Sequence, residues 1–192
     1  MNNVRSYSDN QLLNRVKNLP SFAGYPKGFW ILGVQSSEDS FDQYDDKFYV
    51  FNGEDFVMVL TGTTNAGKNG LLKYETYNPE GVAVVKTDEW YYNVWAYGLH
   101  QGKMPALKQV KPFLISRDGD KDQKVEEEIS KPIICGINFH CNDYGLDSLD
   151  MKQFIGAWSL GCQVSNDVAK YKKLIDLVKP QKVVSYCLIK EF

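Results

Sequence analysis

The chain has 192 residues and a mass of 21.9 kDa, which suffices for one domain but is too short for two full hydrophobic cores. Hydrophobic residues make up 43% of the chain and charged residues 24%, values that exclude a disordered or fibrous protein. The 22 basic and 24 acidic residues give a net charge of −2, which excludes nucleic-acid binding through a generally basic surface. We therefore expect one globular domain and no nucleic-acid partner.

The aromatic content indicates the class of secondary structure. Tyr, Phe and Trp together make up 14% of the chain, and large flat side chains pack well on pleated sheets. The composition therefore favours a mostly-β fold before any periodicity is considered.

The sequence shows no membrane or export signal. No apolar run approaches the roughly 18–20 residues that cross a bilayer, so we expect no membrane partner. The polar segment from Met1 to Asn10 lacks the apolar stretch of a signal peptide, which predicts synthesis in the cytoplasm. The four cysteines are too few and too unevenly spaced for a disulfide scaffold, so we expect free thiols.

Taken in chain order, the hydrophobic pattern predicts a helix, a series of short strands and a second helix. The first helix begins at the N-cap pair Ser8-Asp9 and stops at Pro20. The turn Asn52-Gly53 between two apolar runs indicates a β-hairpin. Strands are expected over residues 29–34, 48–51, 56–60, 82–85, 91–95, 113–115, 133–139 and 183–189.

The second helix follows an N-cap at Ser165 or Asn166 and is closed by Pro180. Its apolar residues fall on one helical face; they are Val168, Tyr171, Leu174, Ile175 and Val178. Many short strands with two helices predict a mostly-β (α+β) domain.

One Gly-rich segment has the spacing of a phosphate-binding loop. Residues Gly62 to Lys68 fit G-x-x-x-x-G-K, but Asn69 stands where a Ser or Thr would bind Mg²⁺. Such a loop must also open a helix, and the following Asn69-Gly70 and Asn78-Pro79 argue against one. We therefore interpret the segment as a loop between strands.

The chain's chemistry centres on a histidine and a cysteine in the last third. His140 ends an apolar run, and Cys162 follows 162 − 140 = 22 residues later, shortly before the second helix. An imidazole can deprotonate a thiol, and a helix N-terminus favours the resulting anion. Gly161 would allow a tight turn that brings backbone N–H groups toward an oxyanion. These features predict a nucleophilic cysteine.

Other interpretations of these residues stay open. A lone cysteine is commonly a core residue, and His100, the second histidine, fits an ordinary loop position at a strand end. A zinc site could form from four residues, although none has C-x-x-C spacing; they are Cys135, His140, Cys141 and Cys162. We expect no metal and no cofactor.

The pattern of His140 followed by Ser159-Leu160-Gly161-Cys162 resembles the active-site signature of the L,D-transpeptidases, cysteine enzymes that act on peptidoglycan stem peptides. The similarity is closest to a divergent group common in bacteriophages and prophages, which shows a Trp-Ser-Ala-Gly-Cys-Gln-like motif. Residues Trp158 to Gln163 match that motif, Gly98 to Lys103 match its Gly-Leu-His-x-Gly-Lys stretch, and Arg117 to Asp120 match its Arg-Asp-x-Asp turn. The resemblance covers the chain from about Asn65 onward.

The resemblance implies a β-sandwich or open barrel over residues 28–192 as one catalytic domain, preceded by a helical lead segment over 1–27. It implies that Cys162 is the nucleophile, that His140 is the base, and that Ser159 and Gly161 shape the turn and the oxyanion pocket. Substrate contacts are expected at Trp158, Gln163 and His100.

The resemblance also implies a function, to which there is one alternative. The expected function is acyl transfer on peptidoglycan stem peptides, as carboxypeptidase, endopeptidase or transpeptidase, acting at the wall after lysis or as part of a virion. Leu160 and Gln163 depart from the family, which has a second His and an Arg or Asn there. The alternative is a non-enzymatic wall-binding or virion structural protein with a degenerate site and other virion proteins as partners.

Overall fold

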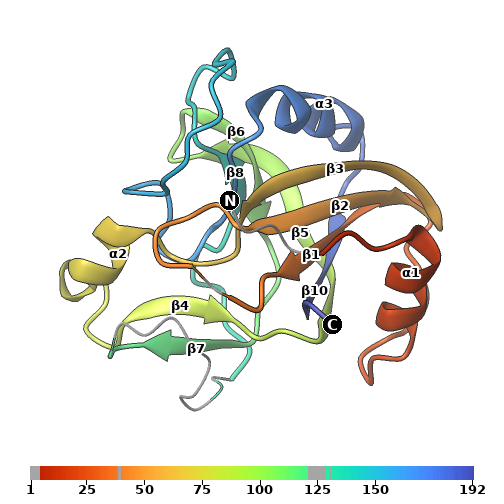
Figure 1. Ribbon diagram of the computed structural model, residues 1–192, viewed down its shortest axis with the longest axis horizontal. Helices are drawn as coiled ribbons and strands as arrows, with labels where there is room; N and C mark the ends of the chain where they lie inside the picture. The colour runs from red at the N-terminus through yellow and green to blue at the C-terminus, as the bar shows by residue number, and fades with distance from the viewer. Residues whose placement is uncertain (1–4, 39, 121–128, 130) are drawn as a thin grey trace.

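A computed structural model describes residues 5–38, 40–120, 129 and 131–192. Eight strands form a barrel; they are β1 (Phe29–Gln35), β2 (Asp46–Asn52), β3 (Asp55–Thr63), β5 (Glu89–His100), β6 (Met104–Gln109), β8 (Phe139–Cys141), β9 (Gln163–Ser165) and β10 (Val184–Lys190). Their order around the closed barrel is β1-β10-β5-β6-β8-β9-β3-β2. Beside the barrel, β4 (Val82–Val85) and β7 (Ile115–Asp118) pair as a separate two-stranded sheet (Figure 1).

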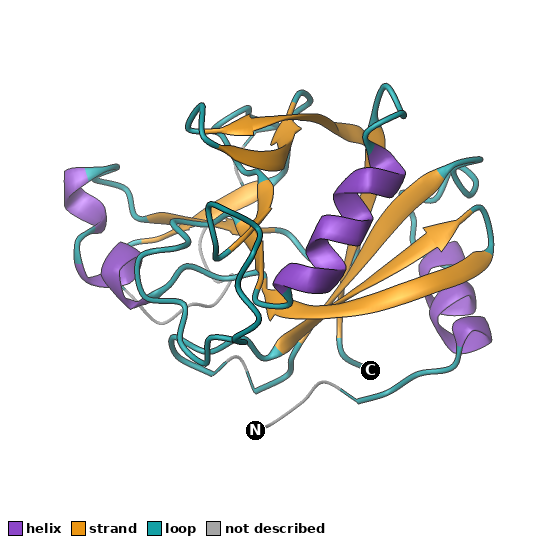
Figure 2. Cartoon of the chain, turned by 90° about the horizontal axis from the view of Figure 1, so that it is seen from above, coloured by secondary structure: helices purple, strands orange, loops and turns teal. Residues whose placement is uncertain are grey.

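Three α-helices surround these strands. They are α1 (Asp9–Lys17), α2 (Lys68–Leu72) and α3 (Val168–Val178), and a 3-10 turn covers Tyr74–Thr76. Figures 1 and 2 show α1 and α2 at opposite ends of the molecule, with α3 between them across the barrel strands. The mostly-β prediction is confirmed, and the barrel is closed rather than the expected sandwich or open barrel.

Helix α1 packs against the outer surface of the barrel. Ser8 and Gln11 form a reciprocal capping box that fixes its first turn. Leu12 and Val16 are fully buried in a cluster that includes Trp30 of β1. Because the helix shares this core with the barrel, the lead segment is part of the same packed unit; its boundary at residue 28 stays a prediction.

The hairpin and the second predicted helix are confirmed, but the N-cap of that helix is Asp167 rather than Ser165 or Asn166. Strands β2 and β3 pair antiparallel on either side of the turn at Asn52-Gly53. All five apolar residues predicted for the face of α3 are buried. The single O–H of Tyr171 is shared between the carbonyls of Pro105 and Phe139, each 3.0 Å away, which links α3 to β6 and β8.

The strand predicted over residues 133–139 is wrong over most of its length. Strand β8 begins only at Phe139, and Ile133 and Ile134 are exposed. The backbone N–H groups of residues 135, 136 and 137 donate to the side-chain oxygen of Gln109 instead of to a neighbouring strand. The buried side-chain amide of Gln109 therefore supplies the hydrogen-bond acceptor that a neighbouring strand would otherwise provide for these three residues.

The Gly-rich segment does open a short helix, contrary to expectation. Helix α2 starts directly after Gly67. Its first amide, that of Lys68, donates to the carboxylate of Asp42 at 2.8 Å. An anion of the chain itself therefore lies where a phosphate loop would hold its ligand.

Among the described residues, no helix has the length and apolar character required to cross a bilayer; the longest, α3, has 11 residues.

Candidate active site

Three side chains from separate segments of the chain meet at the site. His100 ends β5, His140 lies in β8, and Cys162 directly precedes β9. One ring nitrogen of each histidine and Sγ of Cys162 all lie within 4.8 Å of one another. Strands β8 and β9 run parallel, with Phe139 opposite Gln163, and this pairing brings the predicted base and nucleophile together.

His140 is buried as a neutral base. Its Nδ1 lies 2.7 Å from the carbonyl oxygen of Cys141, which can only accept, so Nδ1 carries the proton. The other nitrogen, Nε2, is buried and has no hydrogen-bond partner among the described residues. Burial, and then the nearby His100, lower the pKa of His140 to about 3. At neutral pH Nε2 is therefore unprotonated and its lone pair is free, and the lowered pKa makes it a weaker base than an ordinary imidazole.

Cys162 is a protonated thiol at rest. Its Sγ donates to the carbonyl of Gly136 at 3.6 Å. Burial raises its pKa to about 11, although a hydrogen bond from the backbone of Asn138 acts in the opposite direction. The expected activation by a helix N-terminus is wrong, because Cys162 leads into β9 and α3 begins only at Val168. The thiol must therefore lose its proton during attack.

Ser159 and Gly161 lie in the turn before Cys162. Ser159 Oγ donates to the carbonyl of Cys162 at 2.8 Å and accepts from the N–H of Gly161 at 3.1 Å. Gly161 has a φ of +120°, and a Cβ there would lie 2.5 Å from the carbonyl oxygen of Ala83. Because its N–H is engaged by Ser159, however, Gly161 does not supply the free oxyanion donor that we expected of it.

His100 is brought into the site by the structure. Its ring is half-buried and stacks on that of His140, with centroids 4.3 Å apart. The side-chain amide of Asn138 lies 3.0 Å from its Nδ1. Burial, and then the charge of Lys108, lower its pKa. His100 is therefore a neutral group beside the thiol rather than an ordinary loop histidine.

Two expected substrate contacts do not reach the pocket. Gln163 is fully buried, accepts from the hydroxyl of Tyr186 at 2.7 Å and donates to the carbonyl of Thr64 at 3.3 Å. Trp158 contacts Tyr144 and lies beneath the ammonium of Lys152, whose Nζ is 4.5 Å from the ring centroid. Gln163 therefore has a structural role, and Trp158 lies outside the residues that line the pocket.

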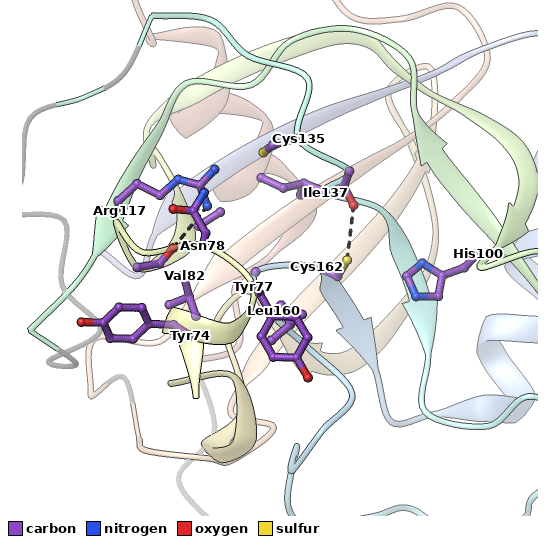
Figure 3. Close-up of a pocket in the computed structure, with 14 residues that line it drawn as sticks. Tyr74, Tyr77, Asn78, Val82, His100, Arg117, Cys135, Ile137, Leu160 and Cys162 are labelled. Atoms are coloured by element: carbon purple, nitrogen blue, oxygen red, sulfur yellow. Dashed lines mark hydrogen bonds between the residues drawn. The ribbon is translucent and has the colours of Figure 1, made fainter. Parts of the chain in front are cut away.

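A pocket of about 320 Å³ opens onto Cys162 and His100 (Figure 3). Leu160 and Gly161 of the cysteine motif also line it, and the rest of its wall comes from other segments. Arg117 from β7 is the one lysine or arginine among the described lining residues, and its Nη1 donates to the carbonyl of Gly81 at 3.3 Å. Tyr74, Tyr77, Asn78 and Cys135 also line the pocket. The Arg-Asp-x-Asp turn pointed to Arg117 and the candidate zinc set included Cys135, whereas no sequence signal pointed to Tyr74, Tyr77 or Asn78.

The same three side chains are the group that could hold a metal ion. The zinc set considered from the sequence does not form among the described residues, since Cys141 instead donates to the carbonyl of Asp143. Coordination through Nε2 of His100 would require a proton on Nδ1, which faces the donating amide of Asn138. The positions of the protons on these side chains therefore fit acid–base chemistry better than metal binding.

A comparison of the chain with protein-family models, with curated proteins and with solved structures finds no match.

Proposed function

We propose that the protein is a cysteine-dependent acyl-transfer enzyme that acts on peptidoglycan stem peptides, and that its barrel is a variant of the L,D-transpeptidase catalytic domain. The single most important observation is the meeting of Cys162 with a buried histidine whose Nε2 has no partner. A polar atom kept buried without a partner costs free energy, and proton transfer from a thiol gives that atom a function.

The reaction starts from a neutral imidazole at His140 and a protonated thiol at Cys162. Sγ of Cys162 forms a bond to the substrate carbonyl carbon while its proton passes to Nε2 of His140, and the carbonyl electron pair becomes an oxyanion. When the oxyanion collapses, the C–N bond breaks and His140 returns the proton to the leaving amine. A thioester remains on Cys162.

Two acceptors can resolve that thioester. In hydrolysis, water loses a proton to His140 while its oxygen bonds to the acyl carbon; the C–S bond then breaks, the carboxylic acid leaves, and the proton returns to Sγ. An amine from a second stem peptide would instead give a cross-link. We propose hydrolysis as the main outcome, with the stem peptide cut after its L-centred residue.

The pocket favours an anionic peptide. Arg117 makes one hydrogen bond to a backbone carbonyl and forms no ion pair with a carboxylate of the described residues. A guanidinium can bind a carboxylate through two parallel N–H groups. Stem peptides end in a carboxylate, so Arg117 supports a carboxypeptidase that releases a terminal D-amino acid.

The test is the release of terminal D-amino acid from purified stem peptides, quantified by mass spectrometry. Cys162→Ala should abolish release, whereas Cys135→Ala removes an exposed thiol of the same pocket and should retain it. Cross-linked products would be detected in the same assay. Wild-type protein that pellets with intact walls but releases nothing would contradict the enzyme and favour the wall-binding or virion structural alternative.

A further inference from the structure

A chain of hydrogen bonds fixes the protonation of His100. The backbone N–H of Gln109 donates to Oδ1 of Asn138 at 2.9 Å, and this bond decides which end of the amide is the oxygen. The opposite end, Nδ2, must then donate to Nδ1 of His100 at 3.0 Å. A neutral His100 therefore has its proton on Nε2.

Gln109 also fixes the loop that leads into Asn138. Its Oε1 accepts from the N–H groups of residues 135, 136 and 137, and its Nε2 donates to the carbonyls of Lys111 and Ile133. The segment that leads into Asn138 is therefore fixed by one side chain that is 9% exposed. Asn138 is therefore held in place, and through its hydrogen bond it also orients His100.

The two histidines consequently have opposite tautomers. His140 carries its proton on Nδ1 and offers a lone pair at Nε2, whereas His100 accepts at Nδ1 and offers an N–H at Nε2. Figure 3 shows the His100 ring turned toward the sulfur of Cys162. One histidine is thus arranged as a base and the other as a donor.

A side-chain donor would have a use at this point in the pocket. Attack by Cys162 creates an oxyanion, which requires N–H groups placed in advance. The N–H of Gly161 is bound to Ser159, and that of Gln163 is bound to the carbonyl of Asn138. The nearest turn amides on both sides of Cys162 are therefore already engaged.

We propose that Nε2–H of His100 is a hydrogen-bond donor to the oxyanion formed at Cys162, and that Asn138 and Gln109 are positioning residues that set its tautomer. The inference rests on the proposed nucleophilic role of Cys162, but it does not depend on which peptide is the natural substrate.

The tautomer can be measured directly. In protein labelled with ¹⁵N-histidine, the two-bond ¹⁵N–¹H spectrum at neutral pH contains only two histidines, and His100→Gln assigns them. We expect the Nε2–H form for His100 and the Nδ1–H form for His140. The Nδ1–H form for His100 would overturn the inference, whether or not stem peptides are cleaved.

The role of the donor is tested with two thiol reagents. Acylation of Cys162 by p-nitrophenyl acetate passes through an oxyanion, whereas alkylation by iodoacetamide does not; the background of each is set with Cys162→Ala. His100→Ala should slow acylation about 10²-fold and alkylation less than threefold. His100→Gln, which keeps a side-chain N–H, should recover most of the acylation rate.

The outcomes separate the donor from the proposed function. Equal slowing of both reactions, or acylation slowed less than threefold, would overturn the donor role. A selective effect on acylation in a protein that releases no D-amino acid would support the donor and contradict the stem-peptide activity.

Discussion

Nδ1 of His140 is hydrogen-bonded to the carbonyl oxygen of Cys141, the residue that directly follows it, at 2.7 Å. The base is therefore oriented by the backbone of its own strand. A neutral carbonyl fixes the tautomer but stabilises an imidazolium less than a carboxylate would. Together with burial, this keeps the resting pair as neutral imidazole and neutral thiol.

The neutral pair predicts an unusual pH dependence. The pKa of His140 is lowered to about 3 and that of Cys162 is raised to about 11. Between these values the base is unprotonated and the thiol is protonated, so kcat/KM should be level from weakly acidic to alkaline pH. As pH falls toward the pKa of His140, protonation of the base should lower the rate. A rising limb near the ordinary histidine pKa of about 6.5 would contradict the neutral pair.

Loss of His140 should remove the proton acceptor. His140→Ala is expected to lower kcat for D-amino acid release by about 10²–10⁴, with folding checked by circular dichroism. His140→Gln is the matched control for side-chain volume and should be equally inactive, because an amide cannot act as a base. Activity within tenfold of wild type in either variant would exclude His140 from this role.

Gly161 should be required by both its conformation and its surroundings. Gly161→Ala places Cβ 2.5 Å from the carbonyl oxygen of Ala83 at a φ of +120°. Gly102→Ala is the matched control, because Gly102 has a φ of +71° but nothing within 4 Å of its Cβ position. We expect Gly102→Ala to lower the free energy of unfolding by about 1 kcal/mol and Gly161→Ala to lower it by clearly more, about 3 kcal/mol. Urea denaturation measures both, and equal losses would show that the contact with Ala83 is unimportant.

Local pattern was sufficient to predict the helices α1 and α3 and the hairpin. The capping residue Ser8, the apolar face that begins at Val168 and the turn at Asn52-Gly53 are all signals within one short window. The turn residues Ser159 and Gly161 and the pairing of His140 with Cys162 were also predicted, because they lie in one motif-bearing segment.

The remaining features depend on contacts between distant residues. Ile133 and Ile134 have the composition of a strand, yet the carboxamide of Gln109 takes the backbone donors of the residues that follow them. The partners of Gln163 come from the residue that directly follows β3 and from β10, and the pocket wall at Arg117 comes from β7. A single sequence does not show which far segment will supply such a partner.

The corrected role of Gln163 can be tested by a double-mutant cycle. Gln163→Leu leaves the hydroxyl of Tyr186 buried without its 2.7 Å partner, which should lower the free energy of unfolding by about 1–3 kcal/mol. Tyr186→Phe in the same chain removes the stranded hydroxyl and should recover part of that loss. KM for stem peptides should not change in any of these variants. An increased KM with unchanged stability would restore Gln163 as a substrate contact.

Arg117 should determine whether the substrate needs a free carboxylate. It lines the pocket with Cys162, and within the described part of the chain its hydrogen-bond partner is one backbone carbonyl. Arg117→Met keeps much of the apolar stem and removes the charge, so KM for peptides with a free carboxyl terminus should rise about 10–100-fold, the effect of losing a charged hydrogen bond of about 1.5–3 kcal/mol. Arg117→Lys should give an intermediate value, because an ammonium cannot form the two parallel bonds. The matched substrate is the same peptide amidated at its C-terminus. The KM of the wild-type protein for this amide should equal the KM of Arg117→Met for the peptide with a free carboxylate. Equal KM values for acid and amide in wild type would remove Arg117 from carboxylate recognition and favour an endopeptidase over a carboxypeptidase.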